Sequence, residues 1–120
     1  MADRVLFIGW GSTVRGREHR GLEVFNEAVG LYGRMQQDGR IESFDVTLLG
    51  ASSILNGYME LKGDTAQIQA LLEDEEFQRT VVDANLIVDD LNVITGYTNA
   101  GIARQMAIYA DAIAKVPQTA

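Results

Sequence analysis

The chain of 120 residues contains no cysteine, and it has only one histidine, one proline and one tryptophan. The lack of cysteine excludes disulfides, thiolate nucleophiles, zinc fingers and iron–sulfur clusters. A single histidine, His19, excludes a metal site built from several histidines of one subunit. The sequence therefore predicts no metal and no other cofactor.

Long apolar runs and an excess of positive charge are also missing. No apolar run approaches the ~18 residues that a membrane-spanning helix needs, and residues 1–4 lack the basic head of a signal peptide. The net charge of −7 argues against general nucleic-acid binding, which depends on lysine and arginine neutralising phosphates. We therefore expect a cytoplasmic protein without a membrane segment and without a nucleic-acid partner.

What is present is an ordinary globular composition, with 47% apolar and 22% charged residues. The length fits one domain, so residues 1–120 are predicted to form a single domain. The hydrophobic period changes between two and 3.6 residues along the chain. It predicts strands at 4–10, 41–49, 58–62 and 91–97, and helices at 17–37, from 64 with a break at 73–76, and at 99–115. This order predicts an α+β ferredoxin-like fold, β-α-β-β-α-β, with an antiparallel sheet and an additional C-terminal helix.

Two of the predicted helices carry apolar residues that step by three and four, as one buried stripe requires. In the first helix these are Leu22, Phe25, Val29, Tyr32 and Met35. In the last helix they are Ile102, Met106, Tyr109 and Ile113. We expect both stripes to be buried.

Polar residues mark where helices begin and end. Asp64 followed by Gln67 predicts a capping box at the start of a helix. Asp74 is placed to begin a second helix within the acidic run, and Asn99 is placed to cap the last one. Gly39 is a suitable left-handed C-cap for the first helix.

The first strand is apolar on both faces. Val5 and Phe7 alternate with Leu6, Ile8 and Trp10, so both sides of the strand require cover. Helices of the same subunit cover one face of a ferredoxin-like sheet. A second copy related by a two-fold axis is the commonest way to cover the other. The sequence therefore predicts a homodimer.

Residues 74–79, followed by residues 84–88, resemble the kinked second helix and last strand of the dimeric α/β-barrel superfamily. The first strand, which runs into a basic loop, is also similar. The resemblance rests on element order and covers nearly the whole chain, and it is to members of the antibiotic-monooxygenase and stress-responsive type. It implies ferredoxin-like subunits that pack sheet to sheet. The superfamily includes cofactor-free monooxygenases, isomerases and haem-degrading enzymes, so the fold alone does not identify a reaction.

Basic residues cluster at the start of the first predicted helix. Arg15, Arg17, His19 and Arg20 could bind a carboxylate or phosphate there, because helix starts attract anions and arginine makes bidentate contacts. His19 is also a weak candidate for a general base, because its ordinary pKa lies near neutrality. The alternative is a solvated basic surface paired with nearby acids such as Glu23.

Aromatic residues are the second candidate set. Trp10, Tyr58 and Tyr97, together with Tyr32 and Phe44, could line an apolar ligand cavity. The alternative is packing in the core and in the dimer interface.

Three functions remain open. The first is a homodimer that binds a small anionic or aromatic ligand in the cleft between sheet and helices, through Trp10, Arg15, Arg17, His19, Tyr58 and Tyr97. The second is a cofactor-independent monooxygenase or isomerase acting on an aromatic or polyketide-like substrate. The third is a structural homodimer with a filled cleft. We prefer the first, because the sequence offers no mutually supporting catalytic pair.

Overall fold

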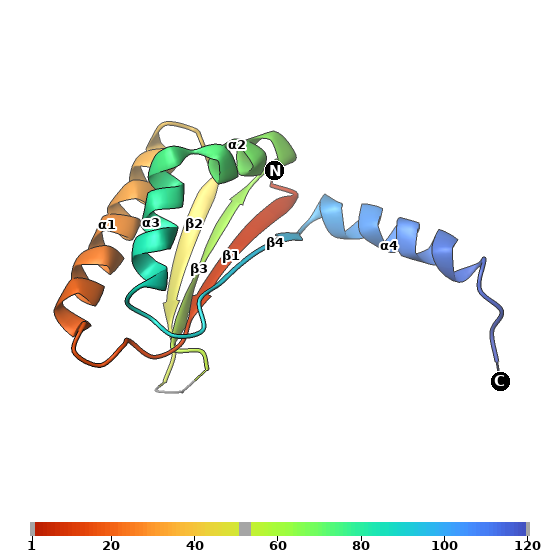
Figure 1. The fold of residues 1–120 in the computed structure, drawn as a ribbon. Coiled ribbons are helices and arrows are strands. Elements are labelled where there is room, and N and C mark those ends of the chain that lie inside the picture. Colours follow the sequence, from red (N-terminus) through yellow and green to blue (C-terminus); the bar gives the residue numbers. More distant parts are fainter. Residues whose placement is uncertain (1, 51–53, 120) are drawn as a thin grey trace.

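The computed structural model describes residues 2–50 and 54–119 and has the predicted order of elements (Figure 1). The elements are β1 (Arg4–Trp10), α1 (Glu18–Gln37), β2 (Ser43–Leu48), β3 (Gly57–Gly63), α2 (Thr65–Glu73), α3 (Glu75–Asn85), β4 (Asn92–Tyr97) and α4 (Ala100–Ile113). The predicted boundaries agree to within two residues at nearly every strand and helix end. The ferredoxin-like fold is therefore confirmed.

The four strands form one antiparallel sheet in the order β2-β3-β1-β4. The pairing places Leu6 of β1 opposite Leu61 of β3 and Thr95 of β4, and Ile8 opposite Met59 and Val93. Since side chains alternate along a strand, these residues share one face of the sheet. Helices α1, α2 and α3 cover this face (Figure 1).

The core lies between this face and the three helices. Its largest fully buried side chains are Tyr32, Leu6, Leu31, Met35, Ile41, Leu61 and Ile68. The predicted stripe of α1 is only partly correct, because its buried residues are Val24, Ala28, Leu31, Tyr32 and Met35. Leu22 is instead 60% exposed. The face of α1 that packs on the sheet is therefore rotated from the predicted face by about one residue.

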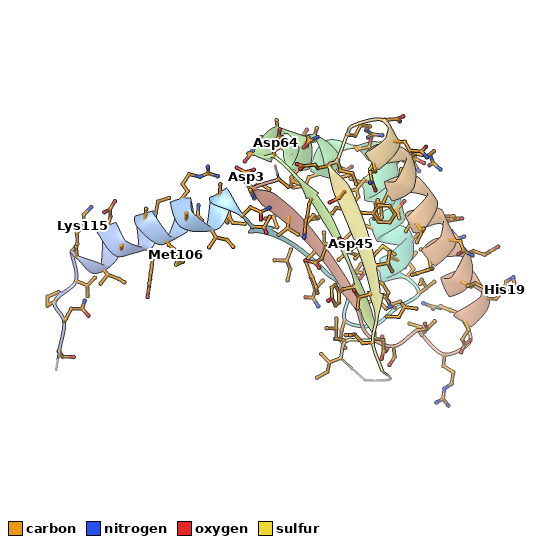
Figure 2. The ribbon with its side chains drawn as sticks, turned by 180° about the vertical axis from the view of Figure 1, so that it is seen from behind. Asp3, His19, Asp45, Asp64, Met106 and Lys115 are labelled. Carbon is orange, nitrogen blue, oxygen red and sulfur yellow. The ribbon has the colours of Figure 1, made fainter. Side chains whose placement is uncertain are left out.

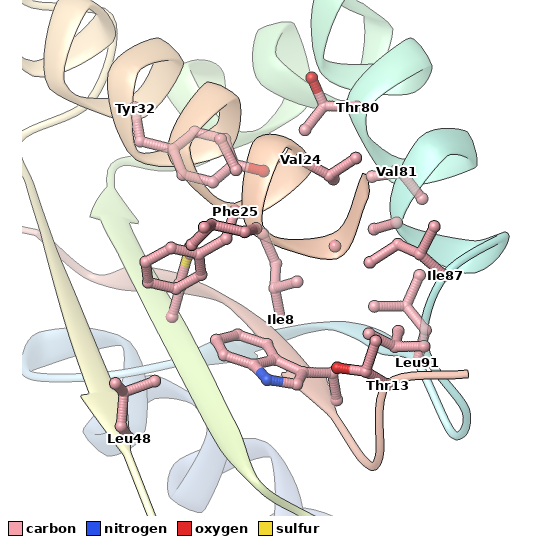
Figure 3. Close-up of a pocket in the computed structure, with 17 residues that line it drawn as sticks. Ile8, Thr13, Val24, Phe25, Tyr32, Leu48, Thr80, Val81, Ile87 and Leu91 are labelled. Atoms are coloured by element: carbon pink, nitrogen blue, oxygen red, sulfur yellow. The ribbon is translucent and has the colours of Figure 1, made fainter. Parts of the chain in front are cut away.

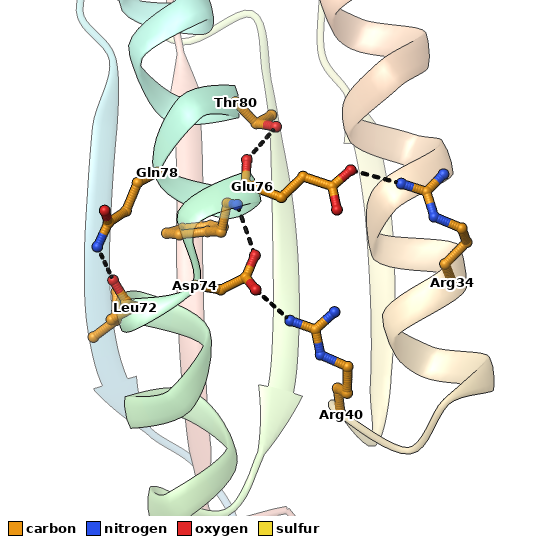
Figure 4. A network of polar contacts seen from close by, with 8 residues as sticks. Arg34, Arg40, Leu72, Asp74, Glu76, Gln78 and Thr80 are labelled. Atoms are coloured by element: carbon orange, nitrogen blue, oxygen red, sulfur yellow. Dashed lines mark hydrogen bonds and ion pairs between the residues drawn. The ribbon is translucent and has the colours of Figure 1, made fainter.

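Helices α2 and α3 meet at the break predicted in the acidic run. Asp64 and Gln67 form the predicted capping box at the start of α2. Asp74 accepts a hydrogen bond from the Phe77 amide at 2.9 Å and forms an ion pair with Arg40 at 2.7 Å (Figure 4). The Asp74 carboxylate thus caps the start of α3 and links this helix to the loop after α1. Both contacts help to hold α3 in place over the sheet.

The other face of the sheet has no cover from the helices α1–α3. It carries Val5 and Phe7 of β1, Tyr58 of β3 and Ile94 of β4, and the Phe7 and Tyr58 rings stack at 5.4 Å between centroids. The same face also carries polar residues: Glu60 and Lys62 of β3 pair with Phe7 and Val5, and Asp45 lies on the edge strand β2 (Figure 2). The strand face that required a second cover is therefore open in the single subunit.

Helix α4 corrects a second prediction. It projects away from the rest of the subunit and covers neither sheet face (Figure 1, Figure 2). The stripe of Ile102, Met106, Tyr109 and Ile113, predicted to be buried, is 39–61% exposed. Among the described residues, no helix is long and apolar enough to cross a membrane.

Candidate ligand-binding cavity

A cavity of about 380 Å³ opens between the covered face of the sheet and helices α1 and α3 (Figure 3). Its walls come from β1, β2 and β3, from α1 between Gly21 and Tyr32, and from α3 with the loop that follows it. The lining residues are Ile8, Trp10, Thr13, Gly21, Leu22, Val24, Phe25, Ala28, Tyr32, Leu48, Met59, Thr80, Val81, Ala84, Ile87, Val88 and Leu91.

Small residues on the helices leave the space. Gly21 and Ala28 lie on α1 and Ala84 lies on α3, where larger side chains would reach toward the sheet. None of the lining residues is charged. The polar side-chain groups of the lining belong to Trp10, Thr13, Tyr32 and Thr80. Such a lining, mostly apolar with a few polar groups, is typical of sites for small organic molecules.

Tyr32 supplies a polar group deep in the cavity. Its ring lies against Phe44 and Phe77, with centroids 6.2 and 6.3 Å away. Burial raises the pKa of the Tyr32 hydroxyl, so the group stays neutral at physiological pH. The hydroxyl bonds to no residue within 2–50 and 54–119, and Figure 3 shows the ring projecting among the lining residues. It is therefore free to donate to, or accept from, a ligand.

The raised pKa of Tyr32 predicts a loss of stability in alkali. The unfolded chain releases the phenolic proton near pH 10, whereas the folded chain retains it, so the free energy of unfolding falls as the pH rises above about 10. By pH 11 the protein should lose on the order of 1 kcal/mol more than the Tyr32→Phe variant. Urea unfolding of both proteins at pH 8 and pH 11 measures this difference, and parallel losses would contradict it.

Trp10 forms one wall of the cavity at the end of β1. Its indole meets the Phe25 ring edge to face, with centroids 6.1 Å apart and an interplanar angle of 72°. Gly57, opposite Trp10 in the sheet, leaves room for the indole, because a Cβ at position 57 would lie 2.6 Å from Trp10 Cζ2. Trp10 is the only tryptophan of the chain, so its fluorescence reports on the cavity alone.

The structure separates the other predicted site residues from this lining. Tyr58 lies on the open face of the sheet, stacked on Phe7. Tyr97 lies at the opposite end of β1, where the Arg4 guanidinium sits 4.3 Å from its ring centroid. Of the six predicted binding residues, Trp10 is the one that lines the cavity.

The basic cluster lies outside the cavity at the start of α1. Arg17 donates to the Leu86 carbonyl at 2.5 Å, and Arg15 and His19 are exposed, with His19 at the outer end of the helix (Figure 2). Arg20 pairs with Glu27 at 3.1 Å, and this hydrogen bond raises the pKa of its guanidinium. The solvated, paired surface weighed as the alternative fits these contacts, and an anion site at Arg15, Arg17 and His19 stays a prediction.

Most of the cavity wall was not predicted. Val81, Ala84, Ile87, Val88 and Leu91 come from α3 and the segment that follows it. Small residues at helix positions that face a sheet could have indicated a cavity. Whether such residues leave a cavity or allow close packing depends on how the helices pack on the sheet. Among the described residues, no group of three or more histidine, cysteine, aspartate or glutamate side chains is placed to hold a metal ion.

No protein-family model and no curated protein matches this sequence. Solved structures do match. An EthD family protein of Bacillus halodurans has a TM-score of 0.62 at 15% identity, over 81% of this chain and 99% of its own. A dimeric protein of unknown function with a ferredoxin-like fold, from Bacteroides fragilis, has a TM-score of 0.59 at 11% identity, over 79% and 96%.

A third match is a protein of Chloroflexus aurantiacus assigned to the antibiotic biosynthesis monooxygenases, with a TM-score of 0.54 at 12% identity, over 82% of this chain and 95% of its own. At these identities the likeness shows the fold alone. The chain shares with these structures the ferredoxin-like subunit fold that the resemblance implied. Each of the three matches leaves about one-fifth of this chain uncovered.

Proposed function

We propose that the protein is a homodimer that binds a small, uncharged aromatic or other apolar molecule in the cavity between the sheet and helices α1 and α3. The observation that carries this proposal is an open cavity of about 380 Å³ without a charged lining residue. Cavities that hold small organic ligands have volumes of about 300–1,000 Å³. The Tyr32 hydroxyl supports the proposal, because it can orient a ligand that carries a carbonyl or hydroxyl group.

The open face of the sheet supports the homodimer. Phe7 and Tyr58 form a stacked pair there, and Ile94 beside them is 54% exposed. Apolar residues gathered on one sheet face mark an interaction surface. A two-fold axis allows the same face of a second copy to cover them. The Bacteroides fragilis protein with this fold is itself described as dimeric.

A cofactor-independent monooxygenase is the second candidate. It is supported by the shared fold of the Chloroflexus aurantiacus protein and by aromatic and phenolic groups, Trp10 and Tyr32, in one apolar cavity. Ligand binding is preferred, because the lining contains no histidine or carboxylate to move a proton. A filled, purely structural cleft is disfavoured by the volume of the cavity.

Binding can be tested with N-phenyl-1-naphthylamine, a neutral aromatic probe, and the emission of Trp10. We expect the probe to quench Trp10 and to bind with 1:1 stoichiometry per subunit. Ala84→Phe fills the cavity from α3 and should weaken binding about tenfold or more, which corresponds to 1.4 kcal/mol. The matched control is Val82→Phe, on the same helix but 59% exposed, and it should bind as the parent does.

Circular dichroism and thermal unfolding of both variants show that they are folded. Equal affinities of Ala84→Phe and the parent would contradict the cavity as the binding site. Aerobic incubation with hydroxylated naphthalenes, followed by mass spectrometry, separates the two candidates, since a gain of oxygen atoms would favour the monooxygenase.

A further inference from the structure

The junction between β4 and α4 holds the last helix away from its own subunit. The Thr98 amide donates to the Asp3 carbonyl at 3.1 Å, and the Asn99 side chain donates to the Ala2 carbonyl at 2.7 Å. Arg104, one turn into α4, pairs with the Asp3 carboxylate at 3.2 Å. These contacts fix the direction of α4 relative to β1, so the projection is a built feature and the helix does not fold back over its own sheet.

The projecting helix has an apolar stripe without cover. Ile102, Met106, Tyr109 and Ile113 lie on one face and are 39–61% exposed. Arg104 and Asp111 lie on the opposite face, together with Ile108, which is 57% exposed. An isolated helix of this length is marginal in water, and its stability comes from packing of the apolar face. The stripe therefore requires a partner surface.

A matching apolar surface lies at the cavity and beside it, where β2 ends. Leu22, Leu48, Leu49 and Ile54 are 42–71% exposed, and we call them the apolar rim. Leu22 and Leu48 also line the cavity itself. Apolar residues gathered at the mouth of an apolar cavity need cover in the same way as the stripe of α4.

The stripe cannot reach the rim of its own subunit. Strands β2 and β4 are the two edges of the sheet, which places them roughly 14 Å apart at the usual spacing of strands. Tyr97, where β4 ends, pairs with Arg4, whereas Leu48, where β2 ends, lies at the Trp10 end of β1. The two positions are diagonally opposite corners of the sheet.

A dimer that packs sheet to sheet brings these corners together. When the strands of the two sheets cross at nearly right angles, the two-fold axis runs along a diagonal of the sheet. One diagonal brings the Tyr97 end of β4 to the partner subunit's Leu48. The other diagonal brings the two Tyr97 ends together and the two Leu48 ends together, so neither stripe meets a rim. Only the first arrangement sets each stripe on a rim, where it also removes the exposed lining of both cavities from water.

We propose that α4 crosses to the partner subunit, and that its stripe packs on the partner's apolar rim and closes the mouth of the partner's cavity. This inference rests on the proposed homodimer. Each cavity is then completed by a second copy of the chain, so the subunit that holds a ligand is not the one that closes over it.

The absence of cysteine allows a direct test. The Leu48→Cys and Met106→Cys chains, with different affinity tags, are co-expressed and oxidised, and covalent heterodimers are resolved on a non-reducing gel. We expect a strong heterodimer band. Asp111→Cys, on the opposite face of α4, replaces Met106→Cys in the matched control and should give little of it. A disulfide within one chain is impossible, because each chain carries a single cysteine.

Light scattering of the unmodified protein distinguishes the two ways in which the proposal can fail. A monomer at micromolar concentration would overturn the homodimer and the crossing helix together. A dimer in which Leu48→Cys links to Met106→Cys no better than to Asp111→Cys would overturn the crossing helix alone. A dominant link between two Met106→Cys chains would show that the helices pair with each other, which also overturns it.

Discussion

Replacing Gly57 by alanine should displace the Trp10 indole and weaken binding of the naphthylamine probe by about tenfold. The new Cβ would lie 2.6 Å from Trp10 Cζ2 and 3.0 Å from the Thr47 carbonyl oxygen. The backbone oxygen belongs to a paired strand and cannot move easily, so the indole must turn away. Overpacking of this kind also costs about 1–3 kcal/mol of stability. Trp10 emission and urea unfolding of the same sample measure both effects.

The control for this variant is Gly33→Ala in α1, where a new Cβ meets no atom within 4 Å. That change should leave probe binding unchanged and raise the free energy of unfolding by about 0.5–1 kcal/mol, because alanine is the better helix former. If Gly57→Ala bound the probe as tightly as Gly33→Ala, the position of Trp10 would not matter for the cavity.

The elements of this fold could be predicted because local residues specify them. Strand β1 is a short, mainly apolar run, and Asp64 and Asp74 cap α2 and α3 at the predicted positions. In α1 the sequence predicted a stripe that begins at Leu22, whereas the structure buries Val24. Only the seating of the helix on the sheet decides that Val24 is buried and Leu22 is exposed.

Helix α4 shows a limit of a different kind. Its stripe is as regular as a buried one, and the sequence predicted burial. The pattern indicates that the stripe packs against another apolar surface. It does not indicate whether that surface belongs to the same chain or to a second copy. The single subunit leaves Met106 and Tyr109 more than half exposed, so the cover must be sought outside the subunit.

Two of the aromatic residues predicted to line a cavity do so, Tyr32 on α1 and Trp10 on β1. Trp10 shares the parity of Leu6 and Ile8, and it faces the helices as they do. Tyr58 pairs with Gly9, which puts it on the opposite face of the sheet. On the α3 side, the small side chain of Ala84 leaves space only because of the distance between the helices and the sheet. That distance cannot be predicted from the sequence.

Replacing Gly101 by valine should release α4 and abolish the link between Leu48→Cys and Met106→Cys. A Cβ at position 101 would overlap the carbonyl oxygen of Asp3, which is backbone next to β1 and accepts the Thr98 amide. The first turn of α4 must therefore move away from β1, and the contacts that direct the helix are lost. We expect a destabilisation of about 1–3 kcal/mol, and a heterodimer yield no higher than that of the Asp111→Cys control.

The matched control is Ala103→Val, which adds a β-branched residue at an exposed position of the same helix. It should keep the heterodimer yield of the parent, because it leaves the junction with Asp3 intact. Light scattering of the Gly101→Val protein shows whether the dimer depends on α4 or on the contact between the sheets. A dimer that persists would show that the sheet faces hold the subunits together. A shift of its Trp10 emission to the red would show that the crossing helix closes the cavity. A Gly101→Val protein that links as well as Ala103→Val would mean that the junction does not direct α4.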